Sequence, residues 1–153
     1  MTLFFAFLIG VFCGLRSFTP AAVTAWAAHL GLLRLVRPLA WVATAPAVGV
    51  FTLLALAELV ADKLPSTPSR TAPVGLIARI VLGAFTGASI AMAGALSLGA
   101  GAALGVVGSI LGTYGGYQLR TRLVKALGAP DFVIALLEDL VAIGGSLFVA
   151  SRF

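Results

Sequence analysis

The feature that most restricts how this chain can fold is a stretch of 40 residues without a charge, between Arg79 and Arg120. A single helix of that length would measure about 60 Å, which is roughly twice the thickness of the hydrocarbon core of a bilayer. The stretch must therefore fold back on itself, and the segment SLGAGA, residues 97–102, is the turn we expect. The sequence thus predicts two neighbouring membrane helices, near 73–96 and 99–119.

The composition places the whole chain in a bilayer. Of its 153 residues 61% are hydrophobic and only 10% are charged, and the mean hydropathy is +1.14. Soluble domains carry roughly 25% charged residues. We therefore expect an all-α integral membrane protein with one domain, residues 1–153, and the lipid bilayer as its surroundings.

The few polar residues exclude several classes of partner. The net charge is +5, but no basic face is interleaved with aromatic residues, so we expect no nucleic-acid partner. The chain has one cysteine, Cys13, and one histidine, His29, which cannot form a His/Cys metal cluster. We predict neither a metal nor a cofactor, and no catalytic residue.

The remaining apolar segments set the number of expected spans. Residues 2–33 contain one formal charge, Arg16, with Pro20 soon after it. This pattern predicts either one long helix or two half-helices broken at GLRSFTP. Two further spans are expected at 39–57 and 132–151, which gives about five transmembrane helices, with four and six as the alternatives.

Small residues recur at helical spacing in the two central spans. One stripe consists of Gly101, Gly105, Gly108, Gly112 and Gly116, and a second consists of Gly83, Gly87, Ala91 and Gly94. Small residues on one face let helices approach closely in lipid. The stripes predict a tightly packed hairpin or a homodimer interface, and a glycine-lined permeation path is the alternative.

Two parts of the sequence resemble each other, as in an internal repeat. Residues 10–31 and 108–128 each contain a G-x-x-x-G, a following arginine and a closing Leu-Gly. Downstream, LALAELVAD is similar to IALLEDLVA, which aligns Glu58 with Glu138. Because three spans would separate the equivalents, the second copy would be inverted, as in many transporters. The predicted repeat halves are residues 1–62 and 98–153, connected by a helix at residues 73–97.

Basic residues give an expected orientation. With five spans, the N-terminal side would hold five basic residues and the other side three. The first group is Lys63, Arg70, Arg120, Arg122 and Lys125, and the second is Arg34, Arg37 and Arg152. The excess favours a cytoplasmic N-terminus, with dual topology as the alternative.

Acidic residues inside or next to the apolar segments are the main candidates for a site. Glu58 and Asp62 are four residues apart and share a helix face, and Glu138 and Asp139 lie within the last span. A charge at bilayer depth costs roughly 2.5–3.5 kcal/mol and is usually paired or functional. We expect structural ion pairing for Asp62 and Asp139, and a functional role for Glu58 and Glu138.

Three basic residues are candidate counter-charges. Arg16, Arg79 and Lys63 are each placed to pair with a membrane carboxylate. Arg16 lies at the expected helix break, where its guanidinium can bind a carboxylate or a phosphate, and a snorkelling arginine is the alternative. Arg70, in the hydroxyl-rich loop TPSRT, is a candidate phosphate ligand, with a solvated loop as the alternative.

Three segments carry a resemblance to a known family. CGLRSFTP, AELVADKLPSTPSRTAP and GAPDFVIALLEDLVA resemble the domain of unknown function 4126 family of small bacterial membrane proteins. Before the last span the family often has TTGGLGNP, where this chain has KALGAPD. The family motif positions would be Gly14, Leu15, Arg16, Glu58, Asp62, Lys63, Pro65, Glu138 and Asp139. The resemblance implies a multi-pass protein of the bacterial inner membrane and implies no activity.

These features together predict a homodimeric transporter or channel-like protein for a cation or a proton-coupled small solute. The predicted binding residues are Arg16, Glu58, Asp62, Lys63, Arg70, Glu138 and Asp139, with Arg16 as the counter-charge of the two glutamates. One alternative is a membrane enzyme or carrier acting on a lipid phosphate. The other is a structural or assembly protein whose buried charges only lock its helices together.

Overall fold

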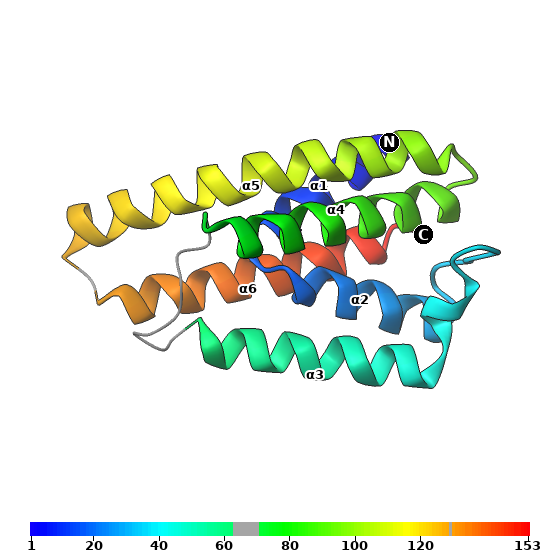
Figure 1. Ribbon diagram of the computed structural model, residues 1–153, viewed down its shortest axis with the longest axis horizontal. Helices are drawn as coiled ribbons and strands as arrows, with labels where there is room; N and C mark the ends of the chain where they lie inside the picture. The colour runs from blue at the N-terminus through cyan, green and yellow to red at the C-terminus, as the bar shows by residue number, and fades with distance from the viewer. Residues whose placement is uncertain (63–70, 129) are drawn as a thin grey trace.

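The computed structural model describes residues 1–62, 71–128 and 130–153, which form six α-helices and no strand. The helices are α1 (Thr2–Leu15), α2 (Phe18–His29), α3 (Ala45–Ala61), α4 (Pro73–Ala93), α5 (Leu98–Leu127) and α6 (Asp131–Ala150), with a short 3₁₀ helix, η1 (Ala40–Ala43), before α3. They form an elongated bundle with the helix axes along its length (Figure 1). The predicted all-α class is confirmed.

The helices differ in whether they are long enough to cross a bilayer. By length and composition α4, α5 and α6 qualify, with 21, 30 and 20 residues. The helices α1 and α3 are apolar but shorter, so the expected count of five spans is not confirmed. The two central spans are where the sequence predicts them, except that α5 continues eight residues past Leu119. Residues 120–127 contain neither glycine nor proline, and the helix ends at Gly128, which has a φ of +59°.

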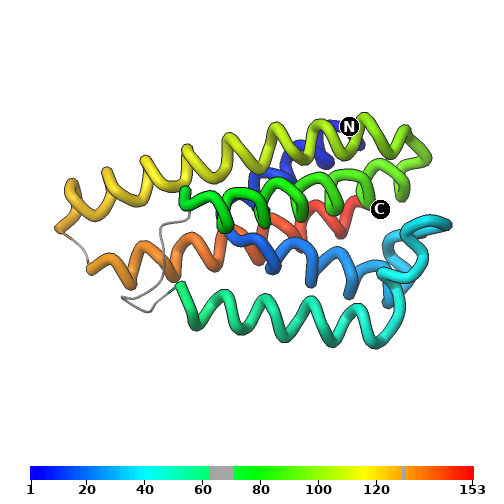
Figure 2. Tube along the Cα trace, in the orientation of Figure 1, coloured from blue at the N-terminus to red at the C-terminus, as the bar shows by residue number. Residues whose placement is uncertain are grey.

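The first apolar segment folds as two helices that form a hairpin. Arg16 has an extended backbone (φ −138°, ψ 118°), which ends α1, and α2 begins at Phe18. Pro20 lies in the first turn of α2, where a missing N–H breaks no helical hydrogen bond. α1 runs away from the end that holds the N-terminus and α2 runs back toward it, so Arg16 and Ser17 form the hairpin tip, part-way along the bundle (Figures 1 and 2).

Glycine faces hold α1, α4 and α5 together. A Cβ built on Gly105 would overlap the carbonyl oxygen of Gly83, and one built on Gly108 would overlap that of Phe7. The hydroxyl of Thr113 donates to the carbonyl of Gly14 at 3.3 Å. The stripes therefore make a tightly packed interface inside one chain, and this face is not left exposed for a second copy or a permeation path.

The hairpin changes the orientation that the sequence predicts. Both termini lie at the same end of the bundle as the connection between α2 and α3, which carries Arg34 and Arg37 (Figure 1). The basic segment at residues 120–125 lies at the opposite end. The N-terminus and this basic segment therefore lie at opposite ends of the bundle, because the hairpin of α1 and α2 returns the chain to the end at which it began.

The predicted repeat remains a prediction, although two comparisons bear on its geometry. α3 and α6, which carry Glu58 and Glu138, run in opposite directions, as an inverted pair would (Figure 1). Residues 10–31 break into two helices, whereas the similar residues 108–128 continue without a break along α5.

Candidate functional site: charges at the hairpin tip

The centre of the candidate site is Arg16, which has no exposed surface. Its Nε donates to Oδ1 of Asp139 on α6 at 2.6 Å. Its Nη1 forms an ion pair with the carboxylate of Asp62 at the end of α3. The side chains of Asp62 and Asp139 are 18% and 10% exposed, whereas the Arg16 side chain has no exposed surface. The hairpin tip is thus attached to two other helices through one arginine.

Glu58 makes the second attachment of the tip to α3. Its two carboxylate oxygens accept hydrogen bonds from the backbone N–H groups of Ser17 and Phe18, at 2.7 and 2.9 Å. The first N–H groups of a helix have no partner within it, and the helix dipole favours a negative charge there. Glu58 therefore supplies the anion that the start of α2 requires.

α4 adds a further charge beside the tip. Arg79 is 4% exposed and donates from Nη1 to the carbonyl of Gly75 at 3.1 Å. The thiol of Cys13, in the last turn of α1, lies 3.3 Å from Oγ1 of Thr86 and within electrostatic reach of both Glu58 and Arg79. Arg79 is thus a second buried arginine, and it lies on the α4 side of Cys13.

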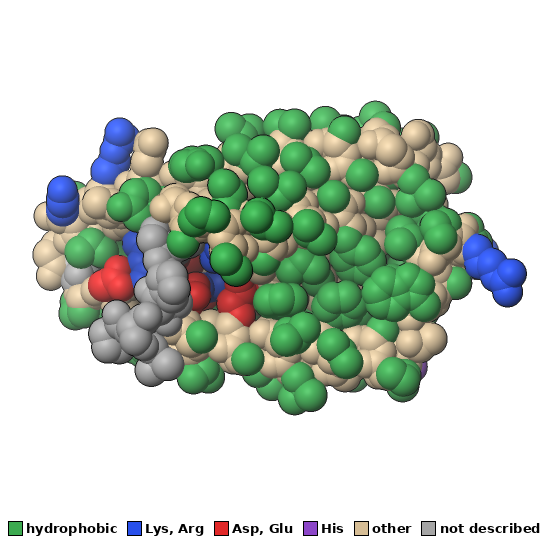
Figure 3. Space-filling view, in the orientation of Figure 1, with side chains coloured by type: hydrophobic (Ala, Val, Ile, Leu, Met, Phe, Trp, Pro, Cys, Tyr) green, Lys and Arg blue, Asp and Glu red, His purple; other side chains and the backbone are tan. Residues whose placement is uncertain are grey.

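We call these side chains the tip cluster: Arg16, Glu58, Asp62, Arg79 and Asp139. In their ionised forms they carry three negative and two positive charges, which is an excess of one negative charge. Acidic side chains gather toward the end of the bundle opposite the termini, where some reach the surface between α3 and α4 (Figure 3). Burying this many charges in an apolar bundle requires nearly complete mutual neutralisation.

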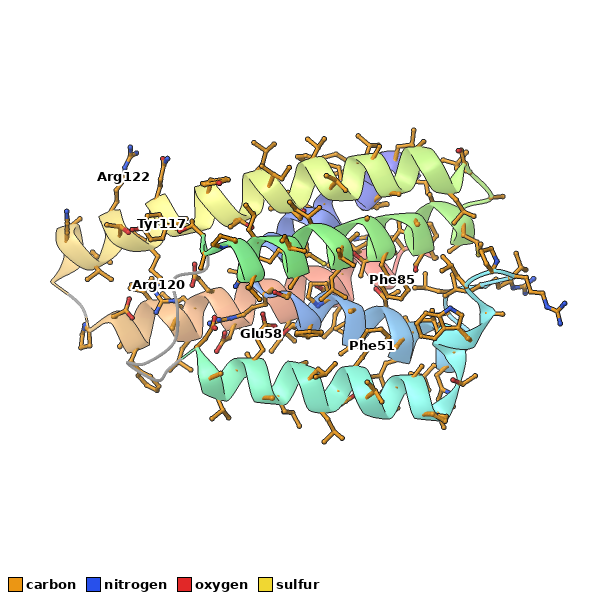
Figure 4. The ribbon with its side chains drawn as sticks, in the orientation of Figure 1. Phe51, Glu58, Phe85, Tyr117, Arg120 and Arg122 are labelled. Carbon is orange, nitrogen blue, oxygen red and sulfur yellow. The ribbon has the colours of Figure 1, made fainter. Side chains whose placement is uncertain are left out.

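A separate ion triad joins α5 to α6 near the same end. Arg120 contacts Asp131 through two hydrogen bonds of 2.7 and 2.5 Å, and Nη1 donates to Oε2 of Glu138 at 3.2 Å. Arg120 and Glu138 also line a cavity of about 140 Å³ whose wall is mostly apolar side chains such as Leu15 and Leu119. Figure 4 shows Arg120 between the two helices and Arg122 pointing away from the bundle.

The structure differs from the sequence prediction in which carboxylates meet Arg16. We expected Glu58 and Glu138, but the described carboxylates in contact with Arg16 are Asp62 and Asp139. Asp62 lies one helical turn beyond Glu58, which itself binds backbone amides. Asp139 follows Glu138 directly, and a step of one residue turns a helical side chain by about 100°. The ion pairs expected for Asp62 and Asp139 are present.

The structure says less about the other residues that the sequence predicts for the site. Lys63 and Arg70 lie outside the described residues. Arg79 was expected only as one of several counter-charges, and no sequence signal pointed to the amides of Ser17 and Phe18 as partners of Glu58. In the described part of the chain, no group of three His, Cys, Asp or Glu side chains could hold a metal ion.

Two buried polar atoms at the tip take no part in these ion pairs and hydrogen bonds. Nη2 of Arg16 and Oγ1 of Thr19, in the first turn of α2, have no hydrogen-bond partner among the described residues. Thr19 is 4% exposed and Arg16 is fully buried. A buried donor without a partner loses its hydration without replacement, so such groups are uncommon in folded proteins.

Three helices able to cross a membrane, together with charges buried between helices, define a helical membrane protein. The family model described as domain of unknown function (DUF4126) matches residues 3–151, nearly the whole chain, and the chain belongs to that family. No curated protein and no solved structure matches the chain. Four of the residues to which the sequence resemblance pointed, Arg16, Glu58, Asp62 and Asp139, lie at the hairpin tip.

Proposed function

We propose that the protein is a multi-pass transporter or channel-like protein of the bacterial inner membrane, moving a proton-coupled small solute or a cation through the tip cluster. The observation that carries this is the burial of Arg16 at the hairpin tip, between carboxylates of α3 and α6. Glycine contacts already hold α1, α4 and α5 together without charge. Charges at bilayer depth are costly and commonly mark a transport pathway.

Glu58 is the group through which proton binding would move the hairpin. As an ionised carboxylate it accepts from two backbone N–H groups of α2. A proton on one oxygen converts an acceptor into a donor and removes the negative charge that faces the helix dipole. Proton uptake would therefore loosen the start of α2 from α3, which links protonation to a conformational change.

An aromatic stack would close the pathway on the other side of the tip. The rings of Trp41, Phe51 and Phe85 stack with centroids 5.5–6.3 Å apart and join η1 and α3 to α4. Phe51 and Phe85 lie nearer the termini than Glu58 does (Figure 4). Phe51 precedes Glu58 by seven residues, or about 10 Å of helix. In the proposed pathway the stack would cover the side of the tip nearer the termini.

The two alternative functions make different demands on the tip. An enzyme or carrier of a lipid phosphate needs an accessible cation, whereas Arg16 is fully buried and already bound by two carboxylates. A structural protein needs only the ion pairs, so neutralising Glu58 would lower its stability and change no flux. A loss of flux on neutralising Glu58 therefore distinguishes a transporter from a structural protein.

Homodimer formation belongs to the same proposal, but the glycine stripes do not provide the interface. Those residues pack within the chain.

The test is proton flux in proteoliposomes that contain a pH-sensitive dye. With a pH gradient imposed, and with Na⁺, K⁺ or a panel of small solutes present, the wild type should acidify the lumen faster than protein-free vesicles. Glu58→Gln should lose this flux, while Asp131→Asn, which removes a carboxylate that is 63% exposed, should retain it. Wild-type flux no faster than in protein-free vesicles under every condition would end the proposal.

A further inference from the structure

We infer that the cavity between α5 and α6 is a binding site for one acyl chain of a bilayer phospholipid, which enters from the leaflet at the end of the bundle opposite the termini. This inference goes beyond the proposed function and does not depend on it, because it concerns a different space with a different ligand. The observations that support it are the packing of α5, the walls of the cavity and its depth along α6.

The cavity arises because α5 is longer than the helices that pack against it. α5 packs mainly against α1 and α4. Leu15, the last residue of α1, shares the cavity wall with Leu119, and α5 continues from there to Leu127. α5 also extends past the start of α4 (Figure 1). Its last part lies beside α6, to which Arg120 bonds it, and a space of about 140 Å³ remains between the two helices.

The walls of this cavity favour an apolar occupant. The polar side chains in the wall are Arg120 and Glu138, and these are bonded to each other at 3.2 Å. A buried water molecule usually makes about three hydrogen bonds, and an apolar cavity of about 150 Å³ stays dry but binds benzene. An apolar occupant restores the dispersion contacts that the walls of an empty cavity lose. The cavity therefore suits a short run of methylene groups better than it suits water.

The opening of the cavity lies at the depth of lipid chains. The cavity is partly open, and the wall residues Leu119, Leu137 and Val141 are exposed. On α6 the wall runs from Ile134 to Val141, about 5–15 Å along the helix from Asp131, which is 63% exposed. Because α6 is long and apolar enough to cross a membrane and the hydrocarbon core is about 30 Å thick, this depth is that of one leaflet.

An acyl chain in the cavity would contact residues next to both groups of charges. Leu15 directly precedes Arg16, and Glu138 directly precedes Asp139, so the cavity wall is continuous with the Arg16–Asp139 ion pair. Glu138 itself belongs to the ion triad of Arg120. The chain would therefore fill the space between α5, α6 and the end of α1, and it would keep water out of that space.

The test is photolabelling in vesicles of phosphatidylethanolamine and phosphatidylglycerol that contain a phospholipid with a diazirine in one acyl chain. Ile134 lines the cavity but is only 2% exposed, so an acyl chain reaches it only from inside the cavity. After irradiation and mass spectrometry we expect lipid adducts on Ile134 and none on Ile90, a fully buried isoleucine of α4. The exposed Leu111 should be labelled in every sample, which shows that the lipid reached the protein.

Two tryptophan variants test whether the chain occupies the cavity itself. Leu137→Trp should abolish the adducts on Ile134, because the larger side chain takes up space in the cavity. Leu136→Trp is the matched control, since Leu136 is the preceding residue of the same helix, is similarly exposed and is not part of the cavity wall. Labelling of Ile134 should persist in that control.

Three results would overturn the inference. The first is labelling of Ile134 no stronger than that of Ile90 while Leu111 is labelled. The second is labelling of Ile134 that is the same in Leu137→Trp as in the wild type. The third is a disulfide between two copies of Leu137→Cys with no adduct on Ile134, which would assign the cavity to a second copy. If Leu137→Trp fails to fold, the comparison of Ile134 with Ile90 in the wild type still decides.

Discussion

The crossing of α1, α4 and α5 predicts that alanine at Gly105 destabilises the protein while alanine at Gly115 does not. A Cβ on Gly105 would overlap the carbonyl oxygen of Gly83, and a Cβ on Gly10 would overlap the carbonyl oxygen of Gly105. The backbones would have to separate. At Gly115, ten residues along the same helix, nothing lies within 4 Å of an added Cβ.

Both substitutions gain the same helix propensity, so the difference between the two variants in the free energy of unfolding measures the cost of the clash. Replacing glycine by alanine inside a helix gains about 1 kcal/mol from propensity. Overpacking a tight contact costs about 1–3 kcal/mol. We therefore expect Gly105→Ala to be less stable than Gly115→Ala by about 1–3 kcal/mol. Unfolding in mixed SDS micelles, followed by circular dichroism, measures this. Equal stability of the two variants would refute the close helix crossing.

Three further predictions concern charge, aromatic packing and topology. Asp139→Asn leaves a buried guanidinium poorly neutralised and should cost about 3–5 kcal/mol, whereas Asp131→Asn, at an exposed pair, should cost at most about 1 kcal/mol; thermal unfolding compares them. Phe85→Ala should cost up to about 3 kcal/mol, because its ring joins two others across the bundle; the same assay would contradict this by showing no change. A cysteine inserted after Met1 and a cysteine introduced at Arg34 should react with an impermeant maleimide from the same side of the membrane, and labelling from opposite sides would refute the hairpin topology.

Sequence reasoning predicted those parts of the fold that are encoded locally. The glycine spacing on α5 indicated a closely packed face, because small residues at intervals of three and four line up on a helix. Arg16 followed by Pro20 indicated a break in the first apolar segment. Both signals depend only on neighbours along the chain.

What the sequence left open depends on contacts between distant segments. A helix break does not reveal whether the chain continues or turns back, so the returning course of α2 was not predicted. Glu138 and Asp139 are adjacent, and only the rotation of α6 against the tip decides that Asp139 meets Arg16. The partners of Glu58 are backbone amides, which every residue except proline carries, so they leave no pattern in the sequence.

The central claim is that a proton on Glu58 releases the start of α2. The most direct measurement compares the ¹H–¹⁵N resonances of Ser17 and Phe18 in the wild type and in Glu58→Gln, where a neutral amide stands in for the protonated carboxyl. Because both amides donate to this one carboxylate, both resonances should shift together in the variant. Two resonances that stay in place in the variant, while its proton flux is lost, would contradict the account.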